Sequence, residues 1–147
     1  MKRTDTKSHC PINFTLEIMG DPWSLLVLRD VVFFGKHTFK EFLESAERIT
    51  TSVLTSRLNS LEQHGILLKQ PHPSDQRSAL YQLTEKGIDL VPVLLAMMEW
   101  GTRYDPKSAG HRKKALVERI RREHSAISHE VQNTLRQGGA VFTPPKT

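Results

Sequence analysis

One segment, residues 51–64, combines a leucine stripe with an opposite face of small polar side chains. Leu54, Leu58 and Leu61 recur at the spacing of one helical face, which predicts a buried side. A solvated helix face usually carries longer charged residues. The side opposite the leucines instead holds hydroxyl and amide groups: Ser52, Ser56, Asn59 and Gln63. This pattern predicts a helix that packs on a core and presents a short polar face outward.

The hydrophobic period changes from helical to extended directly after Gly65. Residues 66–70 and 79–83 are predicted strands, and the polar segment 71–77, with two prolines, predicts the turn of a hairpin. Capping residues and apolar periodicity predict helices over residues 11–19, 22–34, 38–46 and 84–104, the last with a kink at Pro92. Two helices joined by a tight turn and followed by a hairpin predict a winged helix-turn-helix. The fold class is then mainly α (α+β), with a two-stranded wing and extra N- and C-terminal helices.

A chain of 147 residues, 37% of them hydrophobic, suits one packed domain. We expect a flexible N-terminus over residues 1–9 and the winged helix-turn-helix over residues 10–104. A linker and an amphipathic helix follow over residues 105–137, and a loose Gly/Pro-rich tail over residues 138–147. The amphipathic helix is expected to span residues 112–137, with Leu116, Ile120, Ile127, Val131 and Leu135 on one side.

The formal net charge of +5 lies entirely in the C-terminal part of the chain. Residues 1–104 hold twelve basic and twelve acidic side chains, whereas residues 105–147 hold nine basic and four acidic ones. A basic segment favours an anionic partner such as nucleic acid, and a solvated helix face is an equally good explanation. The N-terminus lacks the apolar core of a signal peptide, and no run is long enough to span a membrane. A cytoplasmic protein without a membrane partner is therefore the simplest expectation.

Short polar side chains allow a helix to approach base edges in the major groove of double-stranded DNA. The candidate DNA-reading residues on the helix 51–64 are Thr51, Ser52, Thr55, Ser56 and Asn59. On the hairpin, Lys69, Gln76 and Arg77 are candidates for contacts to phosphates or the adjacent minor groove. Arg57 lies beside the leucine stripe, so pairing with a nearby carboxylate is expected, and a phosphate contact is the alternative.

The single cysteine, Cys10, excludes an internal disulfide framework and a cysteine-rich zinc site. It precedes a predicted helix N-terminus, with Lys7 and His9 nearby, and such surroundings favour the reactive thiolate. Cys10 is therefore a candidate sensor of oxidants or electrophiles, and a structural thiol buried at a dimer interface is the alternative. The seven histidines show no metal-binding spacing, and the sequence shows no nucleophile–base motif or cofactor-binding turn. We expect no metal, no cofactor and no enzymatic activity.

Five groups of residues between Cys10 and Gly101 carry a family resemblance. They are Cys10-Pro11 with Gly20-Asp-Pro-Trp-Ser-Leu-Leu-Val-Leu-Arg29, Phe39-Lys-Glu-Phe-Leu43, Ile49–Leu58, Leu61–Leu67 and Tyr81–Gly87. In order and spacing they resemble the HxlR family of bacterial transcription regulators. Ser52 and Asn59 depart from this pattern, because many relatives carry basic residues at the matching positions. These departures leave the operator sequence and the strength of binding open.

The resemblance implies a homodimer that binds an inverted-repeat operator. It also implies that the helices 11–19 and 84–104 form the dimer interface, with Met97, Met98 and Trp100 as candidate contacts. Burial of this Met/Trp stripe in the domain's own core is the alternative. Some members of the family sense oxidants or electrophiles through the cysteine that matches Cys10, so an oxidant or small-molecule inducer is expected. A winged-helix module that binds a protein instead of DNA is the alternative function, and the neutral charge of residues 1–104 keeps it open.

Overall fold

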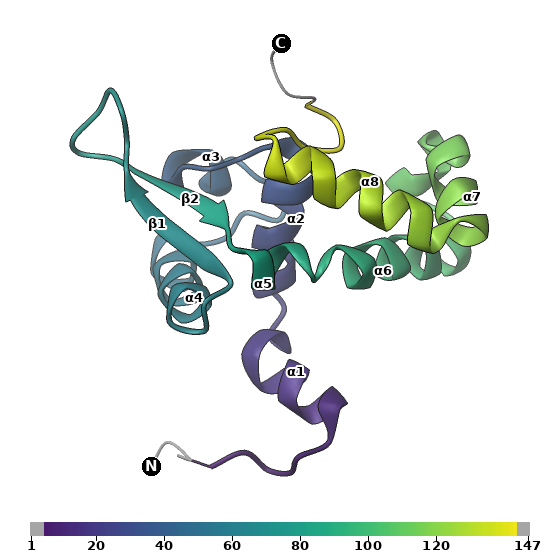
Figure 1. Ribbon diagram of the computed structural model, residues 1–147, viewed down its shortest axis with the longest axis horizontal. Coiled ribbons are helices and arrows are strands. Elements are labelled where there is room, and N and C mark those ends of the chain that lie inside the picture. The colour runs from purple at the N-terminus through teal and green to yellow at the C-terminus, as the bar shows by residue number, and fades with distance from the viewer. Residues whose placement is uncertain (1–4, 144–147) are drawn as a thin grey trace.

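The computed structural model describes residues 5–143 and shows a largely helical chain with a two-stranded antiparallel sheet (Figure 1). In chain order the elements are α1 (Pro11–Met19), α2 (Ser24–Phe34), α3 (Phe39–Leu43), α4 (Thr51–Gln63), β1 (Leu67–Pro71), β2 (Ala79–Leu83), α5 (Glu85–Ile88), α6 (Val91–Tyr104), the 3₁₀ helix η1 (Ala109–Arg112), α7 (Lys114–Arg122) and α8 (His124–Arg136). This order confirms the predicted winged helix-turn-helix.

Helix α2 forms the centre of the core, because it is apolar on most of its surface. Leu28, Val31 and Val32 are almost completely buried. The helix begins at Ser24, slightly later than predicted, because the Asp21 carboxylate accepts hydrogen bonds from the amides of Trp23 and Ser24, both at 2.8 Å. It ends at Gly35, whose φ of 66° is the left-handed conformation that favours glycine.

Two threonine caps position the helix-turn-helix. Thr38 and Glu41 form the predicted capping box at the start of α3. The Thr50 hydroxyl accepts a hydrogen bond from the amide of Val53 at 3.3 Å and caps α4. The leucine stripe of α4 is buried as predicted, which fixes the opposite face of this helix toward solvent.

The hairpin is the predicted wing, with both ends of β1 one residue later than predicted. Leu67 pairs with Leu83 and Pro71 with Ala79 in an antiparallel register. The chain before α3 also contacts this sheet, since the Tyr81 amide donates a hydrogen bond to the His37 carbonyl at 2.8 Å. The wing is therefore held on the core by its inner strand, β2.

The predicted helix 84–104 is two helices and not one kinked helix. The chain breaks between α5 and α6, and Pro92 lies in the first turn of α6. The backbone N–H groups of a first helical turn have no carbonyl partner within the helix. Pro92, which lacks this N–H, therefore lies at the start of α6 without disrupting it.

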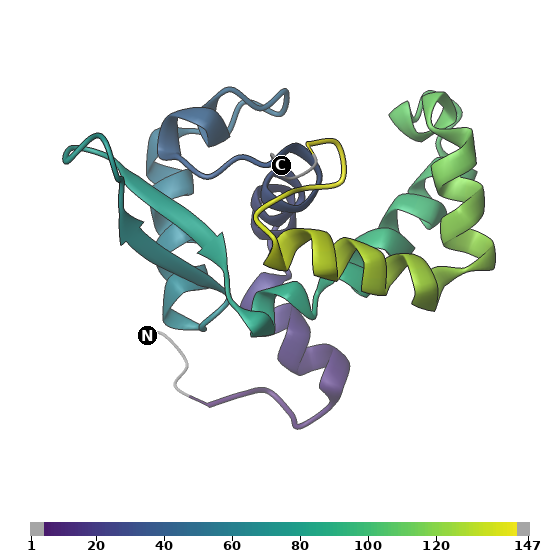
Figure 2. The ribbon, with the colours of Figure 1, turned by 45° about the horizontal axis from the view of Figure 1, so that its top comes forward.

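The predicted single helix 112–137 is also wrong, because the structure divides it at Glu123 into α7 and α8. Helices α6, α7 and α8 form an arm, and α8 runs back along α6 toward α2 (Figure 2). Ile120 on α7 and Ile127 and Val131 on α8 are all buried in the common core. The break allows both halves to direct their apolar sides inward.

The sequence predicted a loose tail from residue 138, and the structure places residues 138–143 against the end of α2. Gly138 has a φ of 82° and turns the chain after α8. The amides of Val141 and Phe142 then donate hydrogen bonds to the carbonyls of Val32 and Phe33, both at 2.9 Å. Residues 1–4 and 144–147, the ends of the predicted flexible termini, lie outside the described residues. Over residues 5–143, no helix is long and apolar enough to cross a membrane.

Candidate nucleic-acid interface

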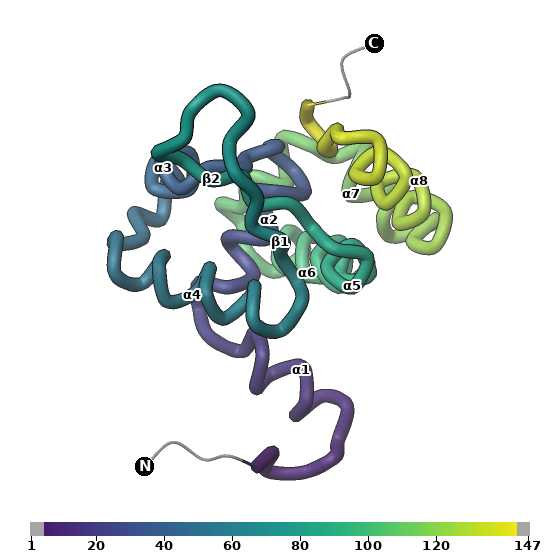
Figure 3. The backbone as a smooth tube through the Cα atoms, turned by 60° about the vertical axis from the view of Figure 1, so that its left-hand side comes forward, coloured from purple at the N-terminus to yellow at the C-terminus, as the bar shows by residue number. Residues whose placement is uncertain are grey.

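Helix α4 and the hairpin lie side by side at one end of the molecule, opposite the α6–α8 arm (Figures 1 and 3). All five predicted reading residues of α4 are exposed: Thr51, Ser52, Thr55, Ser56 and Asn59. The Thr55 hydroxyl donates to the Thr51 carbonyl at 2.8 Å, and the Ser56 hydroxyl accepts from Arg57 at 3.0 Å. Over residues 5–143, the side chains of Ser52 and Asn59 make no hydrogen bond, so both remain available to a partner.

Arg57 has the structural role that its position on α4 predicts. Its guanidinium lies 3.3 Å from the Asp21 carboxylate, which links α4 to the start of α2. Partial burial raises the pKa of Asp21, but hydrogen bonds from Ser24 and the nearby backbone amides, together with the charge of Arg57, lower the pKa overall. The pair therefore orients α4 on the core.

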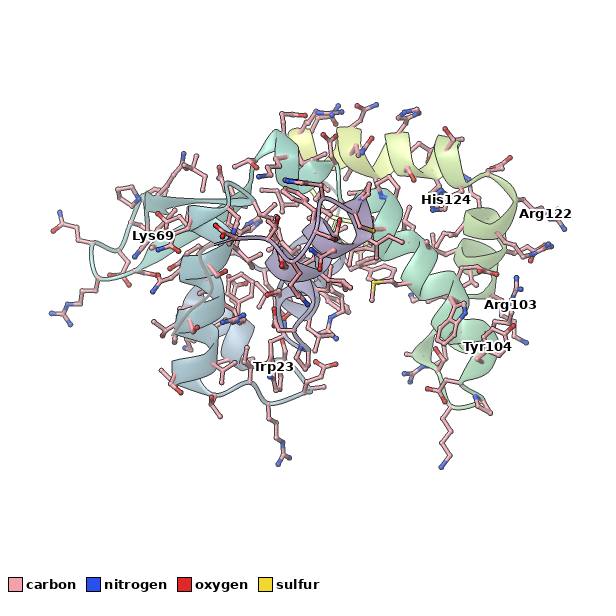
Figure 4. The ribbon with its side chains drawn as sticks, turned by 90° about the horizontal axis from the view of Figure 1, so that it is seen from below. Trp23, Lys69, Arg103, Tyr104, Arg122 and His124 are labelled. Atoms are coloured by element: carbon pink, nitrogen blue, oxygen red, sulfur yellow. The ribbon has the colours of Figure 1, made fainter. Side chains whose placement is uncertain are left out.

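The wing carries the remaining predicted contacts at or near its tip. Lys69, Gln76 and Arg77 are all exposed. Lys69 lies on β1 opposite Tyr81, and Figure 4 shows it on the hairpin, at the end of the molecule opposite Tyr104. The Arg77 amide donates to the Asp75 carboxylate at 3.0 Å. Within the described part of the chain, neither the Arg77 guanidinium nor the Lys69 ammonium forms an ion pair. These cations can reach phosphates beside a groove that receives α4.

An ionic network around the buried Asp30, which no sequence pattern predicted, supports the helix-turn-helix. Arg29 binds the Glu47 carboxylate at 2.6 Å and the buried Asp30 at 2.8 Å. The Ser45 hydroxyl donates to Asp30 and accepts from Lys36 at 2.8 Å. The hydrogen bond from Arg29 lowers the pKa of Glu47 to about 2. The network joins α2 to the turn after α3, so it sets the position of α4.

Two exposed apolar surfaces lie away from α4 and the wing. On α6, Val93, Met97, Trp100 and Tyr104 follow one helical face, and the Trp100 and Tyr104 rings lie 5.2 Å apart. Of the three predicted interface residues, Met98 instead packs against the core. On α1, which projects from the body in Figure 1, Ile12, Phe14 and Leu16 are more than half exposed. Exposed apolar patches of this kind mark interaction sites.

Cys10 is exposed at the N-cap of α1, directly beside the apolar surface of that helix. Its amide donates to the Ser8 hydroxyl at 3.3 Å, and its carbonyl accepts the first hydrogen bond of the helix. The thiol is therefore accessible in the single chain, and its burial at a dimer interface stays an alternative prediction. Among residues 5–143, no three His, Cys, Asp or Glu side chains gather in a way that could hold a metal ion.

Comparison with known proteins places this arrangement among transcription regulators. The model of the HxlR-like helix-turn-helix family matches residues 18–109. The HTH-type transcriptional regulator YdeP of Bacillus subtilis is 35% identical over 101 residues, which are 69% of this chain and 78% of YdeP. The structure of PA1607 is 35% identical, with a TM-score of 0.64 over 71% of this chain and 72% of PA1607. The redox regulator HypR, in its oxidized form, is 34% identical, with a TM-score of 0.59 over 65% of this chain and 98% of HypR.

Proposed function

The chain belongs to the HxlR-like helix-turn-helix family of transcription regulators, and we propose that it binds an inverted-repeat DNA sequence as a homodimer. The observation that carries this proposal is the exposed hydroxyl and amide face of α4 beside an exposed basic wing. An α-helix fits the major groove, and short side chains let its backbone lie close to the bases. The wing then follows the phosphates, and the apolar faces of α1 and α6 join two protomers so that two α4 helices meet two half-sites.

An electrophoretic shift with the DNA upstream of the protein's own gene tests this function. Sharp binding that weakens as salt rises supports it, because phosphate contacts release counterions. Absence of binding at low salt would support the alternative, a winged helix that binds another protein. A shuffled DNA of the same composition separates specific from general attraction.

Asn59→Ala is expected to weaken binding to the operator by about 1–3 kcal/mol and binding to shuffled DNA by less. The amide is exposed in the middle of the α4 face and can form paired hydrogen bonds with a base edge. Fluorescence anisotropy on both DNAs measures the difference. Gln137→Ala, which removes an exposed amide at the end of α8, is the matched control. Equal losses on the two DNAs would show that Asn59 does not read bases.

Arg77→Ala is expected to weaken binding to every sequence and to lower the slope of log affinity against log salt by about one unit. The reason is the loss of one phosphate contact at the wing. Arg121→Ala removes the same charge from α7, in the distant arm, and should leave the slope unchanged. If Arg77→Ala leaves the slope of log affinity against log salt unchanged, Arg77 does not contact the DNA.

We also propose that Cys10 makes the regulator responsive to oxidants. Its exposure beside the α1 surface supports this proposal, and so does the similarity to the redox regulator HypR. Oxidation by hydrogen peroxide would join two Cys10 thiols of one dimer in a disulfide, while their two electrons and two protons reduce the peroxide to two waters.

Peroxide is expected to convert the wild type to a species of twice the mass on a non-reducing gel, and dithiothreitol should reverse the change. Cys10→Ser should remain a single-chain band and keep its DNA affinity under peroxide. The wild-type affinity should change under the same treatment. A wild type that neither cross-links nor changes its DNA affinity would refute the sensing role.

A further inference from the structure

A cleft lies where the wing strand meets the C-terminal segment. Its volume is about 500 Å³, within the range of small-molecule sites. The lining comes from β2, α5, the end of α8 and the Gly138–Gly139 turn, with Val31 of α2 and His37 behind them. The family model ends at residue 109, so one wall lies in the shared domain and the other beyond it.

The cleft has an apolar floor and a polar rim. Val31 and Ile88 are buried, and Leu83 and Leu135 are partly buried beside them. Gln82, Glu85 and Arg136 stand at the exposed rim. Concave sites with such a floor and a few polar groups bind partly apolar small molecules.

The charges at the rim neutralise each other. Arg136 holds the Glu85 carboxylate through two nitrogen atoms, each at 3.0 Å, and its third nitrogen donates to Asn133 at 3.0 Å. An anionic ligand would have to displace Glu85, and a cationic ligand would have to displace Arg136. An uncharged ligand fits the cleft without breaking this pair.

The imidazole ring of His37 supplies a hydrogen-bonding group to the cleft. Its Nδ1 lies 2.9 Å from the Tyr81 carbonyl, and because a carbonyl only accepts, Nδ1 must carry the proton. In the neutral ring Nε2 is then an acceptor. Over residues 5–143 no hydrogen bond reaches Nε2, so the histidine can accept one from a ligand.

We propose that this cleft binds an uncharged, mainly apolar small molecule whose hydroxyl or N–H group donates a hydrogen bond to Nε2 of His37. Gln82 and Leu83 belong to the wing strand, so a bound molecule would join the wing to α8. The regulatory consequence, a change in DNA affinity, rests on the proposed function, whereas binding to the cleft does not.

Titration of the full chain without DNA tests the site. The probes are 1-naphthol, 1-methoxynaphthalene, which has lost the donor, and 1-naphthoate, which adds a negative charge. Calorimetry is expected to show binding of 1-naphthol about five- to tenfold tighter than that of the methoxy compound, the value of one hydrogen bond. The naphthoate should bind more weakly than 1-naphthol. Equal affinities for 1-naphthol and its methoxy analogue would overturn the proposal.

Leu135→Trp fills the floor of the cleft and should abolish binding of 1-naphthol. His129→Trp adds the same side chain at an exposed position of α8 outside the cleft and should leave binding unchanged. Methyl NMR on the wild type supplies a test that does not depend on how these variants fold. The methyl signals of Leu83, Ile88 and Leu135 should shift with 1-naphthol, and shifts confined to other methyl groups would refute the site. DNA binding by the ligand-free protein is measured separately. A failure of the proposed function is thereby distinguished from a failure of the proposed ligand site.

Discussion

Removal of residues 106–147 is expected to lower the thermal unfolding midpoint by roughly 10–20 °C, which corresponds to about 3 kcal/mol for a domain of this size. The deleted segment buries Ile120, Ile127 and Val131, and each such side chain contributes about 1.5–3 kcal/mol. The deleted helices pack against α6, so part of its buried apolar surface would become exposed. The entropy regained by the deleted residues offsets part of this loss.

Circular dichroism measures the midpoint, and a chain that ends at Thr143 is the control, because it keeps every described contact of α7 and α8. The same pair of proteins separates the two roles of the basic segment. If the association rate with DNA is unchanged in the truncated chain while the midpoint falls, the segment is structural. If DNA binding weakens most at low salt, its charge attracts DNA over a distance. An unchanged midpoint would show that α7 and α8 do not stabilise the core.

Ion pairs of α7 and α8 favour the structural role. Arg119 binds Glu123 at 3.0 Å and also pairs with Glu130, so it bridges the break between the two helices. Arg121 and Arg122 share Glu118. These arginines pair with carboxylates of α7 and α8. Within residues 5–143, the basic side chains of the segment that are exposed and form no ion pair are Lys107, Arg112, Lys113 and Lys114. The net charge of the segment stays positive, but Arg119 joins α7 to α8 and Arg136 joins α8 to α5.

The elements fixed by local rules could be predicted from the sequence. The capping box of Thr38 and Glu41, the Thr50 cap and the leucine stripe of α4 all involve residues close in sequence. The structure contains each of these three features. The exposed polar face of α4 followed directly from the same helical period. The predicted DNA contacts themselves remain predictions, because exposure shows only that these side chains are available.

The features that the sequence did not reveal depend on contacts between distant segments. Neither glycine nor proline marks the break at Glu123, and Leu116, Ile120 and Ile127 fit one continuous helical stripe equally well. The chain forms two helices there because both α7 and α8 pack against α6. The same holds for Asp30, whose partners Lys36 and Ser45 lie in loops with no sequence periodicity.

The exposed stripe of α6 provides the second large expected effect. Trp100→Asp is expected to convert a dimer at micromolar concentration to a monomer, because it places a charge at the centre of the apolar face. Trp100 is 66% exposed and Tyr104 is 64% exposed within one chain. A surface substitution at such a position changes the stability of the protomer by only about 0.5 kcal/mol, so folding should be preserved. Light scattering measures the mass, and Ala126→Asp on the exposed side of α8 is the control.

Loss of the dimer should reduce affinity for a two-half-site operator by about a hundredfold or more, because the second protomer binds at a high effective concentration only when it is joined to the first. Affinity for a single half-site should hardly change, since α4 and the wing are intact in the monomer. This contrast separates a lost dimer from a damaged reading surface. A Trp100→Asp protein that keeps the dimer mass would show that the α6 stripe is not the interface. A monomer that still binds the full operator as tightly as the wild type would show that the protein does not act on DNA as a dimer.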